Sequence, residues 1–220
     1  MLHSDEAVAN LRAEGIADER MHFVGNTMID SLVAMEPRFR GLEAAARLGV
    51  EPGGYVLVTL HRPALVDGPL LPVVLVRLGE LSRELPVVFP VHPRTRARME
   101  GLALASGILV IDPVGYLDFL SLEADARAVL TDSGGVQEET TYLGVPCFTL
   151  RAATERPVTV RAGTNTVLGL APERIADVLP SLAAGTSPPA EPPPLWDGHA
   201  ADRVVEVLKR VFVEPAGAVA

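Results

Sequence analysis

The stretch AVLTDSGGVQEE, residues 128–139, decides the fold prediction. An apolar run ends in Thr-Asp, which is typical of a buried strand, and the glycines that follow allow a helix to begin. A plain structural turn needs one glycine at most, so Gly134 and Gly135 suggest that something approaches the backbone here. A strand, a tight turn and a helix in this order form one unit of a parallel α/β sheet.

The rest of the chain repeats this alternation. Runs rich in β-branched residues predict strands at 21–27, 55–61, 87–92, 107–113, 128–133 and 146–150. Nearly continuous apolar strands that alternate with helices indicate a parallel sheet covered on both faces. The predicted fold class is therefore α/β, with a Rossmann-like, doubly wound parallel sheet. Ligands of such sheets bind beyond the carboxyl ends of the strands, and those ends are polar here: GNT, LHRP, VHPRT, DPVGY and TDSGG.

Four segments are expected along the chain. They are a lead-in strand and helix (1–36), the Rossmann-like domain (37–186), a proline-rich connector (187–198), and an amphipathic helix with a tail (199–220). The last helix carries an apolar stripe of Val204, Val207, Leu208 and Val211. We expect this stripe to dock on the same domain or on a partner domain.

Composition excludes several classes of protein. With 220 residues, 48% hydrophobic and 21% charged, the chain is globular, and a net charge of −9 without a long basic run argues against nucleic-acid binding. Cys147, the only cysteine, cannot form an internal disulfide and is expected in a buried strand. The apolar runs are too short for a membrane span, so a soluble cytoplasmic protein is expected. CxxC, HExxH, Walker and GxSxG sequences are absent, so neither a metal nor a cofactor is predicted.

The glycine turn has two interpretations. The start of a helix presents free N–H groups and a positive dipole end, and with the Ser133 hydroxyl it suits a phosphate or diphosphate. Glu139, about one turn further on, could accept hydrogen bonds from ribose hydroxyls. Alternatively, Ser133 is a simple N-cap and the glutamates are surface residues that complement the dipole. Spacing alone leaves both interpretations open.

Other strand ends carry candidate residues. His61 suits proton transfer or a hydrogen bond to a leaving phosphate, and Arg62 suits a phosphate or carboxylate, although such pairs are often structural. His92 stands at the end of the predicted strand 87–92. Arg156 matters only if it faces the glycine turn. Tyr116 and Phe119 are either core residues or flat neighbours for a nucleobase.

Taken together, the motifs resemble the non-hydrolysing UDP-N-acetylglucosamine 2-epimerases. The resemblance runs in family order through VGNTMIDSL (24–32), VTLHRP (58–63), GYLDFLSL (115–122), LTDSGGVQEETTYLGVPCFTLR (130–151), TERPVTVRAGTNTVLG (154–169) and GHAADRVVEVL (198–208). The combination of SGG-x-QEE, LGVP, TERP and GTN is far more specific than any block alone. One departure is HRPALVD, where the family more often has His-Arg-Arg-Glu-Asn.

The resemblance implies one half of a two-domain, glycosyltransferase-B-like architecture with UDP in the cleft between the domains. The chain matches the C-terminal domain and the segment that leads into it. The acids that move the sugar C2 proton belong to the N-terminal domain in that family, so we expect a homodimer or a missing N-terminal domain as partner. The implied reaction interconverts UDP-GlcNAc and UDP-ManNAc by eliminating UDP and adding it back through a 2-acetamidoglucal.

The resemblance also implies residue roles. The implied substrate contacts are Val114 (backbone) and Phe119 at the uracil, Glu139 at the ribose, Ser133, Gly134 and Gly135 at the diphosphate, and Arg156 at the phosphates or sugar hydroxyls. His61 is the implied catalytic residue near the departing UDP. Arg62 and His92 match positions where a second UDP-sugar, UDP-GlcNAc, would bind as an allosteric activator. Glu138 is expected at the surface.

Two alternatives remain at this level. The chain could be the nucleotide-binding half of a UDP-sugar glycosyltransferase, which shares the fold and the nucleotide corner. It could also be a non-catalytic UDP-binding remnant. The TERP and GTN blocks favour the epimerase.

Overall fold

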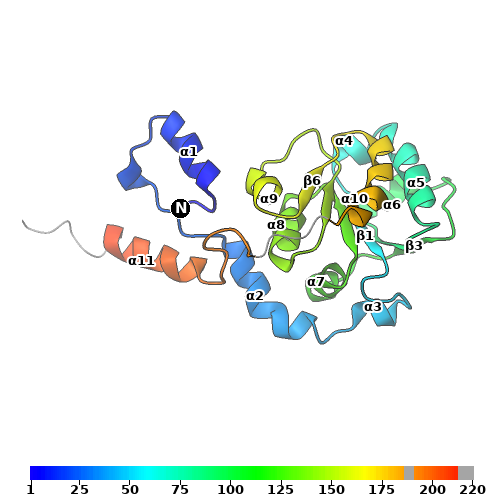
Figure 1. Cartoon of the computed structure of the whole chain (residues 1–220), viewed down its shortest axis with the longest axis horizontal. Coiled ribbons are helices and arrows are strands. Elements are labelled where there is room, and N and C mark those ends of the chain that lie inside the picture. The colour runs from blue at the N-terminus through cyan, green and yellow to red at the C-terminus, as the bar shows by residue number, and fades with distance from the viewer. Residues whose placement is uncertain (186–190, 213–220) are drawn as a thin grey trace, which may run out of the picture.

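A computed structural model describes residues 1–185 and 191–212, and its centre is a parallel sheet of six strands (Figure 1). The strands are β1 Val56–Thr59, β2 Val87–Pro90, β3 Ile108–Ile111, β4 Ala128–Thr131, β5 Cys147–Thr149 and β6 Asn165–Val167. Their spatial order is β3-β2-β1-β4-β5-β6, with every pair parallel. The predicted Rossmann-like, doubly wound sheet is confirmed.

Side chains that alternate along each strand build a core on each face of the sheet. In β1, Val56 and Val58 belong to one core cluster and Leu57 to the other. The first cluster is covered by α4 Pro63–Val66, α5 Leu70–Leu81, α6 Pro93–Met99, η2 Pro172–Asp177 and α10 Val178–Ala183. The second is covered by α3 Ala44–Arg47, α7 Tyr116–Ala124 and α8 Gly134–Leu143. Both faces are therefore buried, as a parallel sheet requires.

Five of the six predicted strands are found, in shortened form, as β1 to β5. The predicted strand at 21–27 is wrong: Phe23 makes only an isolated parallel bridge with Leu2, away from the sheet. The chain instead enters a helix at Asn26, whose side chain accepts a hydrogen bond from the Met28 N–H. The sixth strand is β6, which we did not predict because its three residues give no apolar run.

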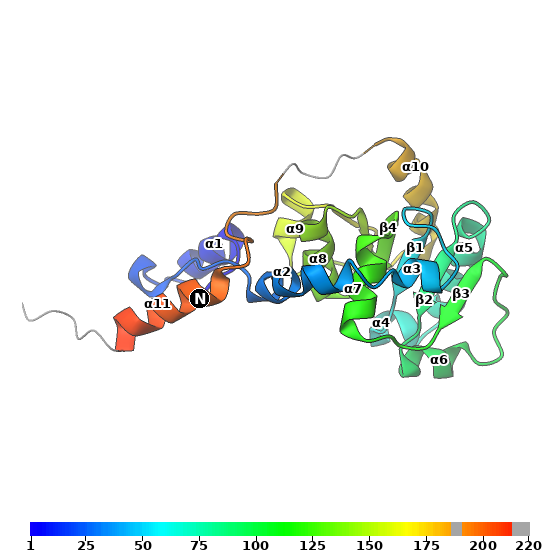
Figure 2. The ribbon, with the colours of Figure 1, turned by 90° about the horizontal axis from the view of Figure 1, so that it is seen from below.

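The ends of the chain pack on each other outside the sheet. The lead-in contains α1 Asp5–Ala13, η1 Asp18–Arg20 and α2 Thr27–Phe39, and α11 Ala200–Phe212 follows the connector; α1 and α11 lie at the same end of the molecule in both views (Figures 1 and 2). Asp30 of α2 accepts hydrogen bonds from the first backbone N–H groups of α11, at 3.0 and 2.6 Å. Buried Trp196 donates its indole N–H to the His3 carbonyl at 3.0 Å.

The predicted apolar stripe of α11 is only partly covered. Val207 is buried, whereas Leu208 and Val211 are 42% and 57% exposed. Two parts of the predicted segments, 187–190 of the connector and 213–220 of the tail, lie outside the described residues.

Candidate functional site

The site lies where the strand order of the sheet reverses. β1 and β4 are neighbours, but the chain continues from β1 towards β2 and from β4 towards β5. Connections on opposite sides leave a crevice at the carboxyl ends of these two strands, which is where doubly wound sheets bind ligands. His61 and Arg62 follow β1, and Asp132 and Ser133 follow β4. The structure therefore brings two of the predicted polar strand ends together.

Asp132 joins the two loops. Its fully buried carboxylate accepts hydrogen bonds from the backbone N–H groups of His61 (2.9 Å) and Arg62 (2.7 Å), and its Oδ1 lies 3.1 Å from Nδ1 of His61. The Arg62 Nε donates to the Asp132 carbonyl at 2.8 Å. We assigned no role to Asp132 from the sequence, although a carboxylate directly after a buried strand was a usable signal. It holds His61 at the crevice.

The glycine turn begins α8 at the same place. Ser133 is the N-cap residue, but its side chain makes no capping hydrogen bond, and its N–H donates to Oγ1 of Thr131 at 2.9 Å. A Cβ added to Gly134 would meet nothing within 4 Å, so the space beside the first turn is open. The hydroxyl of Ser133 and the first N–H groups of α8 are thus not used by a side-chain cap.

Glu139 lies further along α8, in a nearly buried position. It is 5% exposed, and it accepts a hydrogen bond of 3.0 Å from the Tyr116 hydroxyl. Burial raises the pKa of Glu139, with the Tyr116 hydrogen bond opposing this shift. Val114 and Phe119 are half-buried and pack against the core cluster on the α7 and α8 side. Phe119, predicted at the base, and Glu139, predicted at the ribose, therefore stand on α7 and α8, which pack together, and Val114 lies in the loop just before α7.

Glu138 corrects the sequence prediction. It was expected at the surface, but it is 2% exposed and its carboxylate lies 2.9 Å from Nε of Arg156 and 3.8 Å from Nε2 of His3. Burial raises the pKa of Glu138, and the nearby Arg156 and His3 oppose the shift. The lead-in covers this side of α8, so a cavity of about 240 Å³ there is lined by His3, Asn26, Glu138 and Arg156 among others. Arg156 thus reaches α8 but is engaged by Glu138.

Gln137 ties three of the sequence motifs together. Its Oε1 accepts hydrogen bonds from Thr154 (2.5 Å) and Asn165 (3.1 Å), and its Nε2 donates to the Ser133 carbonyl at 3.0 Å. The SGG-x-QEE, TERP and GTN blocks, which are distant in sequence, therefore meet beside the glycine turn. We assigned no role to Gln137 from the sequence.

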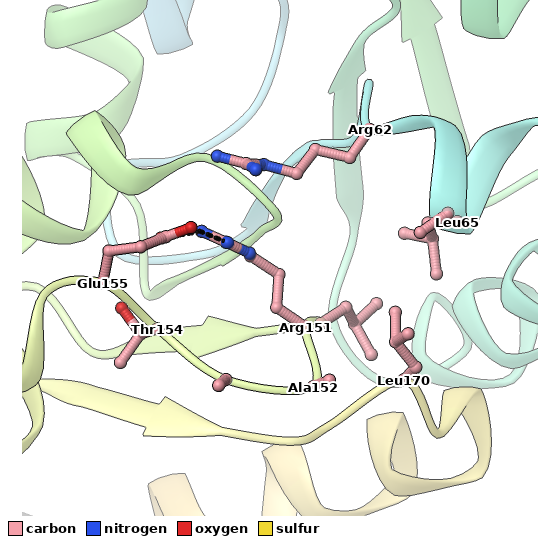
Figure 3. A pocket seen from close by; sticks show the side chains of 10 residues that line it. Arg62, Leu65, Arg151, Ala152, Thr154, Glu155 and Leu170 are labelled. Atoms are coloured by element: carbon pink, nitrogen blue, oxygen red, sulfur yellow. Dashed lines mark hydrogen bonds and ion pairs between the residues drawn. The ribbon is translucent and has the colours of Figure 1, made fainter.

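A cavity of about 380 Å³ opens next to Arg62 (Figure 3). Its lining is mostly apolar, from Leu65, Leu150 and Leu170 among others, with Arg62, Arg151 and Glu155 along one side. Arg151 forms an ion pair with Glu155, and this lowers the pKa of the Glu155 carboxyl to about 2. We did not predict the role of Arg151.

The two residues predicted at an activator site, Arg62 and His92, both lie near His61. Arg62 follows His61 in the chain and lines the cavity of about 380 Å³. His92 is exposed, caps α6 by accepting a hydrogen bond from the Arg94 N–H at 3.2 Å, and has its ring centroid 6.3 Å from that of His61.

Within residues 1–185 and 191–212, none of the helices combines the length and apolarity needed to cross a membrane. In the same ranges, no group of three or more His, Cys, Asp or Glu side chains is placed to hold a metal ion. Cys147 is fully buried, as predicted, and burial raises the pKa of its thiol to about 12.

Comparison with known proteins gives consistent matches. The family model of UDP-N-acetylglucosamine 2-epimerase matches residues 1–209. The UDP-N-acetylglucosamine 2-epimerase of Methanococcus maripaludis is 36% identical over 189 residues, which are 80% of this chain and 51% of the relative. The UDP-2,3-diacetamido-2,3-dideoxy-D-glucuronate 2-epimerase of Pseudomonas aeruginosa is 35% identical over 210 residues, 93% of this chain and 58% of the relative.

A solved structure matches in the same way. The Methanocaldococcus jannaschii UDP-GlcNAc 2-epimerase, crystallised in complex with UDP-GlcNAc and UDP, superposes with a TM-score of 0.79 and 33% identity, over 94% of this chain and 59% of that one. The chain thus spans little more than half the length of these relatives. The matches agree with the glycine turn and with the hydrogen bonds of Gln137 that join the sequence motifs. They show that the chain belongs to the UDP-N-acetylglucosamine 2-epimerase family.

Proposed function

We propose that this chain supplies the UDP-binding half of an enzyme that interconverts UDP-GlcNAc and UDP-ManNAc. The observation that supports it most is the uncapped start of α8 at the switch point of the sheet, with Glu139 on the same helix. An open helix start suits a diphosphate, and a carboxylate one turn on suits a ribose. A relative of similar fold was crystallised with UDP-GlcNAc and UDP.

The proposed contacts run along UDP from the diphosphate through the ribose to the uracil. Ser133, Gly134 and Gly135 bind the diphosphate through the hydroxyl and backbone N–H groups, and Glu139 binds the ribose. Phe119 and the backbone near Val114 flank the uracil. Arg156 keeps its ion pair with Glu138 and directs its remaining N–H groups towards phosphates or sugar hydroxyls.

The proposed reaction has two stages. A base removes the proton from C2 of the sugar, the C1–O bond to UDP breaks, and a 2-acetamidoglucal forms. Protonation of C2 on the opposite face and re-addition of UDP at C1 then give the epimer. No atom changes its oxidation state overall, so we propose that the reaction uses no redox cofactor.

This chain would act on the departing UDP. The first N–H groups of α8 would face the proposed diphosphate and would stabilise the negative charge that develops as the C1–O bond breaks. We propose that His61, whose position is fixed by Asp132, donates a hydrogen bond to the leaving phosphate. These are the two contributions that the described residues support.

The C2 chemistry would come from elsewhere. Because the chain spans 51% to 59% of the relatives compared above, we propose that a further domain or a second copy of the chain completes the cleft. Such a cleft must close to retain the glucal and UDP. A second UDP-GlcNAc at Arg62 and His92 is our proposal for an activator. Charged nucleotide sugars do not cross a bilayer unaided, so we propose a cytoplasmic reaction.

A second substrate class is favoured by one observation. The Pseudomonas aeruginosa relative, at 35% identity, is named for a UDP-diacetamido-uronate instead of UDP-GlcNAc. The residues discussed above concern the nucleotide, which both substrates share. Epimerisation of UDP-2,3-diacetamido-2,3-dideoxy-glucuronate is therefore the alternative.

The nucleotide site is tested by titrating the purified chain with UDP in a calorimeter. We expect UDP to bind and to raise the melting temperature, and Ser133→Ala and Glu139→Ala to weaken binding by about tenfold each, since each removes a hydrogen bond to or from a charged group. Ser31→Ala and Glu84→Ala alter exposed residues and serve as matched controls. Absence of heat and of a melting shift at millimolar UDP would refute the proposed site.

A further inference from the structure

We infer that Tyr116 is a positioning residue whose hydroxyl orients the Glu139 carboxylate for the ribose of UDP. This inference rests on the proposed function. From the sequence, Tyr116 was either a core residue or a flat neighbour for a nucleobase. The structure gives Tyr116 a different partner, a carboxylate on the neighbouring helix.

The geometry of the pair is specific. Tyr116 is the first residue of α7, which follows β3, and Glu139 is on α8, which follows β4. The Tyr116 hydroxyl donates to Oε1 of Glu139 at 3.0 Å. Within residues 1–185 and 191–212, this is the only hydrogen bond made to the Glu139 carboxylate.

The surroundings of Glu139 explain why it needs this donor. From α7, the buried Glu123 faces it without a hydrogen-bond partner on either oxygen, and Glu138 is its neighbour on α8. Burial and the charge of Glu138 both disfavour ionisation of Glu139, and the phenol favours it. Without Tyr116 the carboxylate would lose both its fixed orientation and its main stabilising contact.

Exposure separates this role from ordinary core packing. Tyr116 is 47% exposed, whereas Glu139 is 5% exposed. The tyrosine therefore lies at the surface and the carboxylate beneath it. A ribose that binds Glu139 through its hydroxyls needs the carboxylate in one fixed orientation, because a long side chain otherwise loses rotamer entropy on binding.

The test measures how tightly two nucleotides bind to the wild-type chain and to two variants, Tyr116→Phe and Tyr142→Phe. Calorimetric titrations use UDP, which has both ribose hydroxyls, and 2′,3′-dideoxy-UDP, which has neither. We expect Tyr116→Phe to weaken UDP by roughly tenfold, the loss typical of one hydrogen bond to a charged group, and to change 2′,3′-dideoxy-UDP by less than about twofold. Only a residue acting through the ribose site gives this difference.

Tyr142→Phe is the matched control, because Tyr142 is on α8, the helix that carries Glu139, and its hydroxyl makes no hydrogen bond within the described ranges. We expect it to leave both affinities unchanged. Equal weakening of both nucleotides by Tyr116→Phe would point to base stacking or folding and overturn the inference, as would an unchanged UDP affinity. Failure of the wild-type chain to bind UDP at all would instead overturn the proposed function, and the inference would fall with it.

Discussion

Glu123, for which we made no prediction from the sequence, is buried in an unusual environment for a carboxyl group. It is on α7, it is fully buried, and neither carboxyl oxygen has a hydrogen-bond partner in the described part of the chain. Burial raises the pKa of Glu123 well above its usual value, and the nearby Glu139 adds to the shift. Burial therefore favours the neutral form of the Glu123 carboxyl, which lies near the proposed ribose ligand Glu139.

This predicts how stability depends on pH. A carboxyl whose folded-state pKa is raised contributes stability that is complete below the unfolded pKa, about 4.3, and is lost as pH rises through the folded pKa. At pH 8 the ionisation of Glu123 in the unfolded chain lowers the free energy of unfolding. We expect Glu123→Gln to raise the free energy of unfolding at pH 8 and to raise it by much less at pH 5.

Urea melts at the two pH values measure this effect. Glu84→Gln removes an exposed carboxyl and is the control, with no pH-dependent gain expected. An increase in the free energy of unfolding that is equal at pH 5 and pH 8 for Glu123→Gln would contradict a raised pKa of Glu123 in the folded protein.

At the scale of the element, the start of α8 makes the sharpest prediction. Gly134 has open space where a Cβ would stand, so Gly134→Ala should fold normally, with the unfolding free energy changed by less than about 1 kcal/mol. The new methyl group would nevertheless occupy the place where the diphosphate is proposed to meet the backbone. We expect UDP affinity to fall at least about tenfold, as one lost charged hydrogen bond would cause.

Calorimetry and thermal melts of the same samples separate affinity from stability. Gly68→Ala also adds a methyl group into open space, but at the loop between α4 and α5, and should change neither property. If Gly134→Ala binds UDP as tightly as the wild type, then the diphosphate does not approach this backbone.

The helix α11 makes a second prediction at this scale. Val207 is buried and Leu208 is 42% exposed, although the two are adjacent. Val207→Ala should therefore lower the unfolding free energy by about 1 to 2 kcal/mol, and Leu208→Ala by less than about 0.5 kcal/mol. Denaturant melts measure both. An equal loss from Leu208→Ala would mean that the outer face of α11 is covered in solution.

At the scale of the whole molecule, we expect the chain by itself to bind UDP without epimerising the sugar. The described residues contain the proposed nucleotide site, while the proposed C2 chemistry needs a second wall to the cleft. Incubating purified chain with UDP-GlcNAc and separating the products by chromatography should show no UDP-ManNAc. Formation of UDP-ManNAc that rises with the square of protein concentration would show instead that two copies complete the cleft.

Much of the fold could be predicted because it depends on local signals. Apolar runs bounded by polar turns identified β1 to β5, since a strand buried on both faces must be apolar throughout. The segment 21–27 has the same local pattern but lies away from the sheet, where Phe23 makes an isolated bridge with Leu2. β6 is too short to leave a pattern, and it exists because β5 offers a free edge.

At the glycine turn, too, part of the structure follows from local sequence signals and part depends on distant segments of the chain. The sequence by itself determined that a strand, a tight turn and a helix follow one another here, and that Glu138 and Glu139 point in different directions, about 100° apart on the helix. Only the tertiary structure decided what each carboxylate meets. The lead-in brings His3 to Glu138, Arg156 joins them, and α7 brings Tyr116 to Glu139. Helical periodicity is local, whereas the neighbour on each side comes from a segment far away in the chain.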